Sequence, residues 1–400
     1  MTITLNDLDF LTSDRGLSLL DRLANDNLSD KNSLSLLTRL RRDYSPEQAG
    51  AALEIAVLRQ KAVTKFGANA AKLLFTRDAL EQASDPLIQQ YRAETVSGKV
   101  LDVCCGIGAD SLAFASARAN VTGLDLDPVR IAIARHNAEV LNLSDRAIFE
   151  IADVRDGIPG DRDLIFFDPA RRDDTGKRIY DVERYIPPLS LIRDWHAPNI
   201  MVKLSPGVEL AQIEGYGGQV EFISVNGDLK EAILHLRSSN LMNPPLATLI
   251  TRGEILHWQR ESEPESRRLS SPLSWLIEPD PAVIRAGLVE DVAQVFNGYQ
   301  LDETIAYFTS DMLPVSPWVK AWRVLDWLPF NLKKLRAHLR ESGVGRVTVK
   351  KRGSPLTPEE LIAQLKLKGG SEARTLVLTR YQGDPIIIIC EEHPAQQLIN

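Results

Sequence analysis

The chain has 400 residues, 44% of them hydrophobic and 25% charged, which is enough for two or three domains that each have a core. Three cysteines (Cys104, Cys105 and Cys390) are too few for a disulfide framework or a standard zinc site. The acidic start has no signal-peptide pattern, and the longest aliphatic run, Ile386 to Ile389, is far too short to cross a membrane. We therefore expect a soluble cytoplasmic protein with no metal.

The charge is unevenly distributed along the chain. The net charge is −7, yet residues 320–400 hold 14 basic and 8 acidic residues, while the rest hold 33 basic and 46 acidic residues. A basic end on an acidic body indicates an anionic partner, such as nucleic acid, for that end. A solvated lysine-rich surface is the alternative.

The first half of the chain divides into a helical part and an alternating part. Leucines at helical spacing, with few glycines or prolines, predict helices over residues 1–95. Short apolar strands then alternate with helices and end in a hairpin that turns at Asn226-Gly227. This pattern predicts a doubly wound α/β sheet with an antiparallel edge. The predicted strands are 99–105, 120–127, 147–153, 163–170, 199–205 and two within 219–237; the predicted helices are 109–117, 128–143 and 182–194.

The second half begins after a plausible boundary at residues 239–245. A hairpin over 247–258 and a polar loop over 261–268 precede a compact region that starts near residue 320. There we expect helices over 331–343 and from Thr357, and strands over 346–353, 374–381 and 385–392. The predicted domains are therefore 1–95, 96–240, 241–319 and 320–395.

The sequence LDVCCGIGAD at residues 101–110 follows the first predicted strand. Gly106 and Gly108 allow a tight turn close to a ligand, but the pattern also fits a reactive thiol pair or an ordinary turn. Adjacent cysteines cannot readily form a disulfide, and the neighbouring aspartates would raise a thiol pKa. The reactive thiol pair is therefore the weaker interpretation.

Acidic residues mark the ends of the first three strands. We expect Asp125 to accept both hydroxyls of a ribose, with Leu126 packing on an adenine. Asp153, followed by Val154, can reach the adenine amino group. Asp102 lies inside an apolar strand, so it needs a cationic ligand group or backbone amides that it orients. A helix cap or a turn is the structural alternative for such residues.

A nicotinamide cofactor fits this loop poorly. Ser111 occupies the position of the third glycine of that fingerprint, and Asp110 lies where a pyrophosphate would bind. The stretch instead resembles class I S-adenosylmethionine-dependent methyltransferases, whose D-x-G-x-G motif is matched at Asp102, Gly106 and Gly108. Cys104 replaces the first glycine. That departure resembles the D-x-x-C-G-x-G pattern of some RNA-modifying branches, and we expect Cys104 to behave as a strand residue.

The sequence FFDPARR at residues 166–172 ends the fourth strand. It resembles the D/N-P-P-aromatic and D-P-P-R motifs of methyltransferases, although Ala170 replaces the second proline. Ser205 lies where uridine C5 methyltransferases carry a cysteine, which disfavours a covalent mechanism. The resemblance implies direct in-line transfer, with Asp168 and Pro169 positioning the acceptor and Arg171 and Arg172 binding a substrate phosphate or carboxylate. A structural turn with surface arginines is the alternative, and Lys203 is either a further contact or a surface lysine.

The C-terminal region resembles the THUMP-like domain of a bacterial family of class I methyltransferases. This resemblance also covers residues 75–84 and 278–288, and it implies an RNA substrate. The predicted phosphate contacts are basic residues of one helix and the following strand: Lys333, Lys334, Arg336, Arg340, Lys350, Lys351 and Arg352.

The sequence as a whole predicts a Rossmann-like, seven-stranded methyltransferase sheet (α/β) between an N-terminal helical domain and a C-terminal α+β THUMP-like domain. The predicted activity is S-adenosylmethionine-dependent methylation of a structured RNA, either tRNA or rRNA. Two alternatives stay open: a methyltransferase acting on a protein or small molecule, and a non-catalytic RNA-binding protein with a vestigial cofactor fold.

Overall fold

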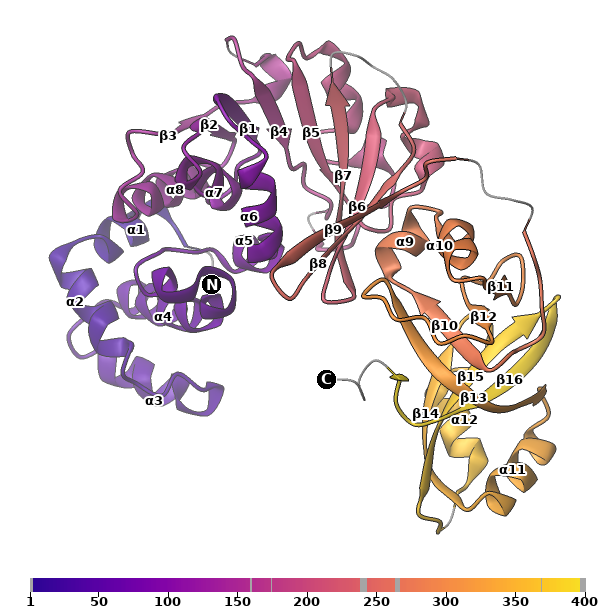
Figure 1. Ribbon diagram of the computed structural model, residues 1–400. Coiled ribbons are helices and arrows are strands. Elements are labelled where there is room, and N and C mark those ends of the chain that lie inside the picture. The colour runs from indigo at the N-terminus through magenta and orange to yellow at the C-terminus, as the bar shows by residue number, and fades with distance from the viewer. Residues whose placement is uncertain are drawn as a thin grey trace. The chain divides into compact units, whose positions relative to one another are not determined.

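The computed structural model describes residues 3–158, 160–173, 175–237, 243–262, 267–367 and 369–395 (Figure 1). It has two compact units: Met1–Val220 with Lys230–Asn243, and Glu221–Leu229 with Pro244–Asn400. Among the described residues, no helix combines the length and apolar character that crossing a membrane requires.

The first unit begins with helices, as predicted. Hydroxyl and carboxylate side chains cap several of them, for example Ser45 at the start of the longest helix. Their core includes Ile107 and Ile133 from the following α/β part, so the helices and the sheet region share one core. Asn137 ties the two parts further, since it accepts from the amide of Leu74 at 2.8 Å and donates to its carbonyl at 3.1 Å. The helices are α1 (Leu5–Leu11), α2 (Asp14–Leu23), α3 (Asp30–Leu40), α4 (Pro46–Phe66), α5 (Arg77–Gln82) and α6 (Pro86–Glu94).

The central sheet contains the seven predicted strands, and the hairpin predicted over 247–258 adds two more, so the described part of the sheet has nine strands rather than seven. Hydrogen bonding orders it β3-β2-β1-β4-β5-β7-β6-β8-β9. Strands β1 to β5 run parallel, and β7 is antiparallel to β5. The strands are β1 (Lys99–Val103), β2 (Asn120–Asp125), β3 (Ala147–Ile151), β4 (Leu164–Phe167), β5 (Asn199–Leu204), β6 (Gln219–Val225), β7 (Asp228–Arg237), β8 (Leu246–Thr251) and β9 (Glu254–Gln259); helices α7 (Ala109–Ser116) and α8 (Pro128–Val140) alternate with them.

Several local predictions were wrong, and the strands predicted over 120–127, 147–153 and 163–170 end early, at Asp125, Ile151 and Phe167. The expected helix over 182–194 is two short 3-10 helices, Val182–Arg184 and Leu189–Asp194, because Pro187 and Pro188 between them lack the amide hydrogens that a helix needs. The first strand ends at Val103 rather than at residue 105. The predicted boundary at 239–245 and loop at 261–268 lie partly outside the described residues, which exclude 238–242 and 263–266.

The second unit carries its own seven-stranded sheet, ordered β11-β12-β10-β13-β16-β15-β14. Leucines of α11 and α12 pack against this sheet at Leu335, Leu339, Leu361 and Leu365. Its elements are β10 (Trp275–Pro279), α9 (Pro281–Arg285), α10 (Val289–Val295), β11 (Tyr299–Gln300), β12 (Phe308–Ser310), β13 (Val319–Pro329), α11 (Leu332–Glu341), β14 (Val344–Lys351), α12 (Pro358–Leu365), β15 (Glu372–Tyr381) and β16 (Asp384–Cys390).

Candidate functional site

A pocket of about 580 Å³ lies at the carboxyl ends of the parallel strands, where doubly wound sheets bind ligands. Segments after β1, β2, β3 and β4 form its walls, and α5 with the residue after it closes one side. Most residues predicted from the sequence meet here. The lining includes Ala79, Gln82, Ala83, Cys104–Ile107, Ala109, Asp110, Leu124–Asp127, Arg130, Ala152–Arg155, Asp168–Arg171, Tyr185–Pro188 and Lys203.

The loop after β1 turns through three left-handed residues, Cys104 (φ 63°), Gly106 (φ 58°) and Gly108 (φ 80°). Cys104 was expected to behave as a strand residue, and that expectation was wrong: it takes part in the turn, in the backbone conformation that favours glycine. A Cβ on Gly106 would meet nothing within 4 Å, so this glycine faces open space beside the pocket. A Cβ on Gly108 would come within 2.9 Å of Phe149, so Gly108 is needed for packing.

Asp125 connects the ends of two strands. One carboxylate oxygen accepts from the amide of Gly106 at 2.9 Å, and the other accepts from the amide of Asp127 at 2.9 Å. Asp127 in turn caps α8, because its carboxylate accepts from the amide of Val129. Leu126, between them, is 56% exposed at the pocket and offers an apolar surface to a ligand.

Asp153 lies in the pocket wall beside Arg155. The Arg155 guanidinium and amide both donate to this carboxylate, and the side-chain hydrogen bond is the main reason that the pKa of Asp153 falls to about 2. Asp153 is therefore an anion, and a hydrogen-bond acceptor, throughout the neutral range.

Asp102 is fully buried and is not part of the pocket lining. One of its oxygens accepts from the hydroxyl of Ser111, and the other has no hydrogen-bond partner among the described residues. Burial is the main cause that raises the pKa of Asp102 well above its usual range. Ser111, which replaces the third glycine of a nicotinamide fingerprint, thus fixes the start of α7 to β1.

Asp168 is paired with a buried lysine. The ammonium of Lys203 lies 2.7 Å from a carboxylate oxygen of Asp168, and the lysine side chain is 3% exposed. Arg171 lies 3.8 Å from the other carboxylate oxygen and donates to the carbonyl of Leu204. Lys203 is therefore no surface lysine, and its place inside the apolar strand NIMVKLS was the signal for this in the sequence.

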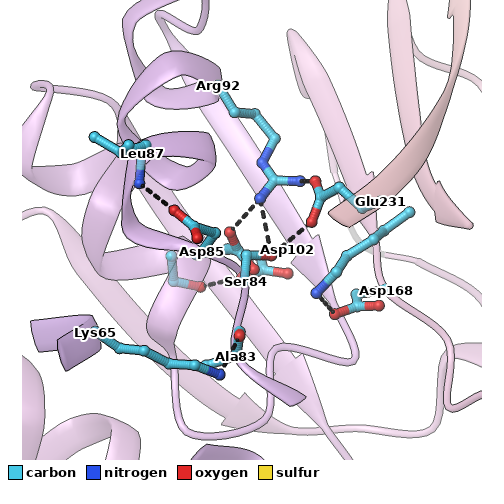
Figure 2. Close-up of polar contacts among 12 residues, drawn as sticks. Lys65, Ala83, Ser84, Asp85, Leu87, Arg92, Asp102, Asp168 and Glu231 are labelled. Atoms are coloured by element: carbon cyan, nitrogen blue, oxygen red, sulfur yellow. Dashed lines mark hydrogen bonds and ion pairs between the residues drawn. The ribbon is translucent and has the colours of Figure 1, made fainter. Parts of the chain in front are cut away.

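Arg92 forms a buried polar cluster that the sequence did not reveal (Figure 2). Its guanidinium donates to Asp110 at 2.8 Å, to Glu231 at 2.7 Å and to Ser84 at 3.1 Å. Burial alone would lower the pKa of Arg92, but the two carboxylates outweigh it and raise that pKa. Because Asp110 also lines the pocket, Arg92 neutralises the charge that was expected to repel a pyrophosphate.

The adjacent thiols have raised pKa values. Burial is the main cause for both Cys104 and Cys105, and Asp125 and Asp102 add to it, as expected from the sequence. A thiol with a raised pKa is a poor nucleophile at neutral pH. No group of three or more metal-ligating side chains occurs in the part of the chain that the structure describes.

The predicted basic residues of the second unit fall into two groups. Lys333, Lys334, Arg340 and Lys351 are exposed. The others make contacts inside the unit: Arg336 donates to the carbonyl of Gln364, while Lys350 and Arg352 lie 2.6 and 3.8 Å from Glu278.

This strand order, with the pocket at the carboxyl ends of β1 to β4, defines the class I methyltransferase fold. A crystal structure of a candidate methyltransferase from Porphyromonas gingivalis has this fold (TM-score 0.77, 21% identity, 98% of this chain and 100% of that chain). Family models for a methyltransferase domain and a THUMP domain-like region match residues 100–168 and 319–392, and a domain of unknown function matches residues 4–62.

The family assignment rests on two relatives that are similar in sequence over most of the chain. Two uncharacterised S-adenosylmethionine-dependent methyltransferases, from two strains of Mycobacterium tuberculosis, are each 32% identical over 340 residues, covering 82% of this chain and 92% of their own. The chain belongs to this family of S-adenosylmethionine-dependent methyltransferases. It is an enzyme of class I with a C-terminal THUMP-like domain, and S-adenosylmethionine is its cofactor.

Proposed function

We propose that this enzyme methylates a structured RNA, either tRNA or rRNA, by direct in-line transfer. The observation that carries the proposed transfer step is the Asp168–Lys203 pair, which lies in the wall of the pocket where the segment Asp168–Arg171 begins. S-adenosylmethionine supplies an activated methyl group on a sulfonium, so the protein has mainly to position and desolvate the acceptor.

The residues of the pocket fit this cofactor. Five acidic side chains (Asp110, Asp125, Asp127, Asp153 and Asp168) and four basic ones line it, and this small acidic excess suits a ligand that bears ammonium and sulfonium charges. Asp125 would hold the ribose hydroxyls, Leu126 would pack on the adenine, and Asp153 with Val154 would lie at its amino edge. The turn of Cys104 and Gly106 would approach the methionine portion. Asp102 would act indirectly, because its carboxylate fixes α7 through Ser111.

Asp168 and its neighbours would receive the acceptor. Lys203 keeps the Asp168 carboxylate in place, so that a free oxygen can accept a hydrogen bond from the acceptor group and orient its lone pair. Pro169 fixes the backbone at this position, and Arg171 and Arg172 would bind an anionic group of the substrate. No cysteine nucleophile is required.

Two features support RNA as the substrate. The C-terminal domain matches the THUMP domain-like model, and its surface exposes the basic residues Lys333, Lys334, Arg340 and Lys351. Exposed cations on one helix and the following strand can contact phosphates without reading sequence.

The test compares RNA nucleosides, by mass spectrometry, from cells with and without the gene. We expect one methylated nucleoside to be lost with the gene and restored by the wild-type protein. Asp168→Asn, which keeps a hydrogen-bond acceptor beside Lys203, should bind the cofactor in calorimetry yet fail to restore the nucleoside.

Other outcomes identify the alternatives. Unchanged RNA nucleosides, together with methylation of a protein or metabolite, would refute the RNA proposal. Full activity of Asp168→Asn would remove the role proposed for Asp168.

A further inference from the structure

A second cavity of about 370 Å³ adjoins the cofactor pocket within the first unit. The two share four lining residues, Gln82, Ala83, Arg171 and Lys203. Lys203 is the residue that holds Asp168, so this second cavity, here named the basic cavity, lies on the acceptor side of the pocket.

The two cavities differ in charge. The cofactor pocket is lined by four basic and five acidic side chains, whereas the basic cavity is lined by six basic and three acidic ones. Its basic residues are Lys65, Arg171, Arg172, Arg178, Lys203 and Lys230, and its acidic residues are Glu81, Asp85 and Glu231.

The positive excess remains when the buried pairs are set aside. Glu231 is neutralised by Arg92 at 2.7 Å, and Lys203 is neutralised by Asp168. Five basic side chains then remain in the lining against two acidic ones, Glu81 and Asp85. An anion that enters this cavity therefore meets a favourable field.

The segment after β4 brings two arginines to this cavity. Arg172 and Arg178 face each other across an antiparallel bridge, and Arg172 donates to the carbonyl of Gly176 at 2.8 Å. Both arginines are exposed in the wall of the cavity, so their remaining N–H groups can reach a ligand. Two guanidinium groups provide the forked donors that match phosphate oxygens.

Lys65 of α4 adds a fixed charge from the helical part of the unit. Its ammonium donates to the carbonyls of Leu80, Glu81 and Ala83 at 2.8, 3.1 and 2.7 Å, so it is held in the wall (Figure 2). Burial, and after it the charge of Lys203, lowers the pKa of Lys65, as expected where cations lie close together. A polyanion would relieve this repulsion.

We propose that the basic cavity binds a phosphodiester of the RNA substrate, next to the nucleotide that is presented to Asp168. The inference rests on the proposed function, and it assigns Arg172 and Arg178 as the direct phosphate contacts. The cofactor then binds on the acidic side of Asp168 and Lys203, and the RNA backbone on the basic side.

The test uses the full chain, bulk bacterial tRNA and rRNA, and the variants Arg172→Gln and Arg178→Gln. The matched control is Lys177→Gln, because Lys177 is an exposed cation of the same segment that does not line either cavity.

Binding is measured as a function of salt concentration. Each arginine variant should reduce the slope of log affinity against log salt by about 1. It should also raise the KM for RNA more than it lowers kcat, since a phosphate contact is made before and during transfer. Cofactor affinity and the unfolding midpoint should not change.

Three results separate the two proposals. Loss of slope in the arginine variants but not in Lys177→Gln supports the basic cavity. Slopes and KM values that equal those of the wild type in all three variants overturn the basic-cavity proposal but leave the proposal of RNA methylation intact. A wild-type protein that binds the cofactor but neither binds nor methylates tRNA or rRNA overturns the proposed function, and the assignment of this cavity with it.

Discussion

Lys203 and Asp168 are held together by the register of two neighbouring strands. Phe167 of β4 is aligned with Val202 of β5, so the residues that follow each of them lie side by side, 2.7 Å apart at their charged atoms. A buried ammonium requires such a partner, and the carboxylate that provides it is also the group that we propose to receive the acceptor.

We expect Lys203→Met to lower methyl transfer on the order of 100-fold, the loss typical of removing one preorganised polar group from an active site. The affinity for S-adenosylmethionine should stay close to that of the wild type. Lys203→Arg, which keeps the charge, should recover part of the activity. Steady-state kinetics and calorimetry measure both quantities, and a fully active Lys203→Met would contradict the role of the pair.

Removing Arg92 should destabilise the first unit strongly. Arg92→Met leaves the buried carboxylates of Asp110 and Glu231 without their cation, and loss of one partner of a buried pair typically costs about 3–5 kcal/mol. Arg77→Met is the control, because Arg77 forms an exposed pair with Glu54 that is worth about 0–1 kcal/mol. Urea unfolding compares the two variants. Similar losses of unfolding free energy in the two variants would show that the buried Arg92 cluster contributes no more to stability than the Arg77–Glu54 pair does.

Asp102 should make stability depend on pH. Its pKa is raised in the folded state. At pH values above about 3.9, the ordinary pKa of aspartate, and below the folded pKa, the native protein therefore holds a proton that the unfolded protein has released. Stability from this group is therefore present below the unfolded pKa and is lost as pH rises through the folded pKa. We expect Asp102→Asn, which still accepts from Ser111, to be more stable relative to the wild type as pH increases.

Urea unfolding of both proteins from acidic to alkaline pH measures this difference. Because the other titrating groups are common to both proteins, the difference between their curves isolates Asp102. A difference that does not change with pH would mean that Asp102 titrates alike in the folded and unfolded states.

Glycine at position 104 should be tolerated. The φ of Cys104 is 63°, a conformation that costs a non-glycine residue about 1–2 kcal/mol. Cys104→Gly should therefore leave the free energy of unfolding unchanged or raise it by about 1 kcal/mol, and should keep cofactor binding. Cys104→Val should be destabilised, because a β-branched side chain fits this conformation poorly. Cys105→Gly is the control, since Cys105 is buried without a positive φ, and it should lose stability.

The fold and much of the site could be predicted because strand ends are local features of the sequence. Apolar runs marked the strands, and the residues directly after them, such as Asp125, Asp153 and Asp168, had to meet at one edge of a parallel sheet. The burial of Lys203 was also indicated by its apolar strand, although one sequence leaves open which face of the strand is covered.

What could not be predicted depends on contacts between distant segments and on backbone conformation. Arg92 and Glu231 are 139 positions apart, and no local pattern pairs them. The positive φ of Cys104 occurs where the next amide, that of Cys105, donates to the carbonyl of Leu124 on a neighbouring strand. The inward direction of Asp102 is likewise accompanied by a hydrogen bond from Ser111 on another element. The helix predicted over 182–194 is a different case. Pro187 and Pro188 indicated in the sequence that a helix could not continue there, but the prediction gave more weight to the helical pattern.

The reciprocal hydrogen bonds between Asn137 and Leu74 bear on the order in which the enzyme can form. The N-terminal helices leave the ribosome first, but their partner in α8 and the strands that complete the pocket are synthesised later. The pocket to which Ala79, Gln82 and Ala83 contribute one wall is thus complete only after β5, which carries Lys203, has been made. A catalytic sheet without these helices would lack one side of this pocket, so the helices and the sheet form a single functional piece.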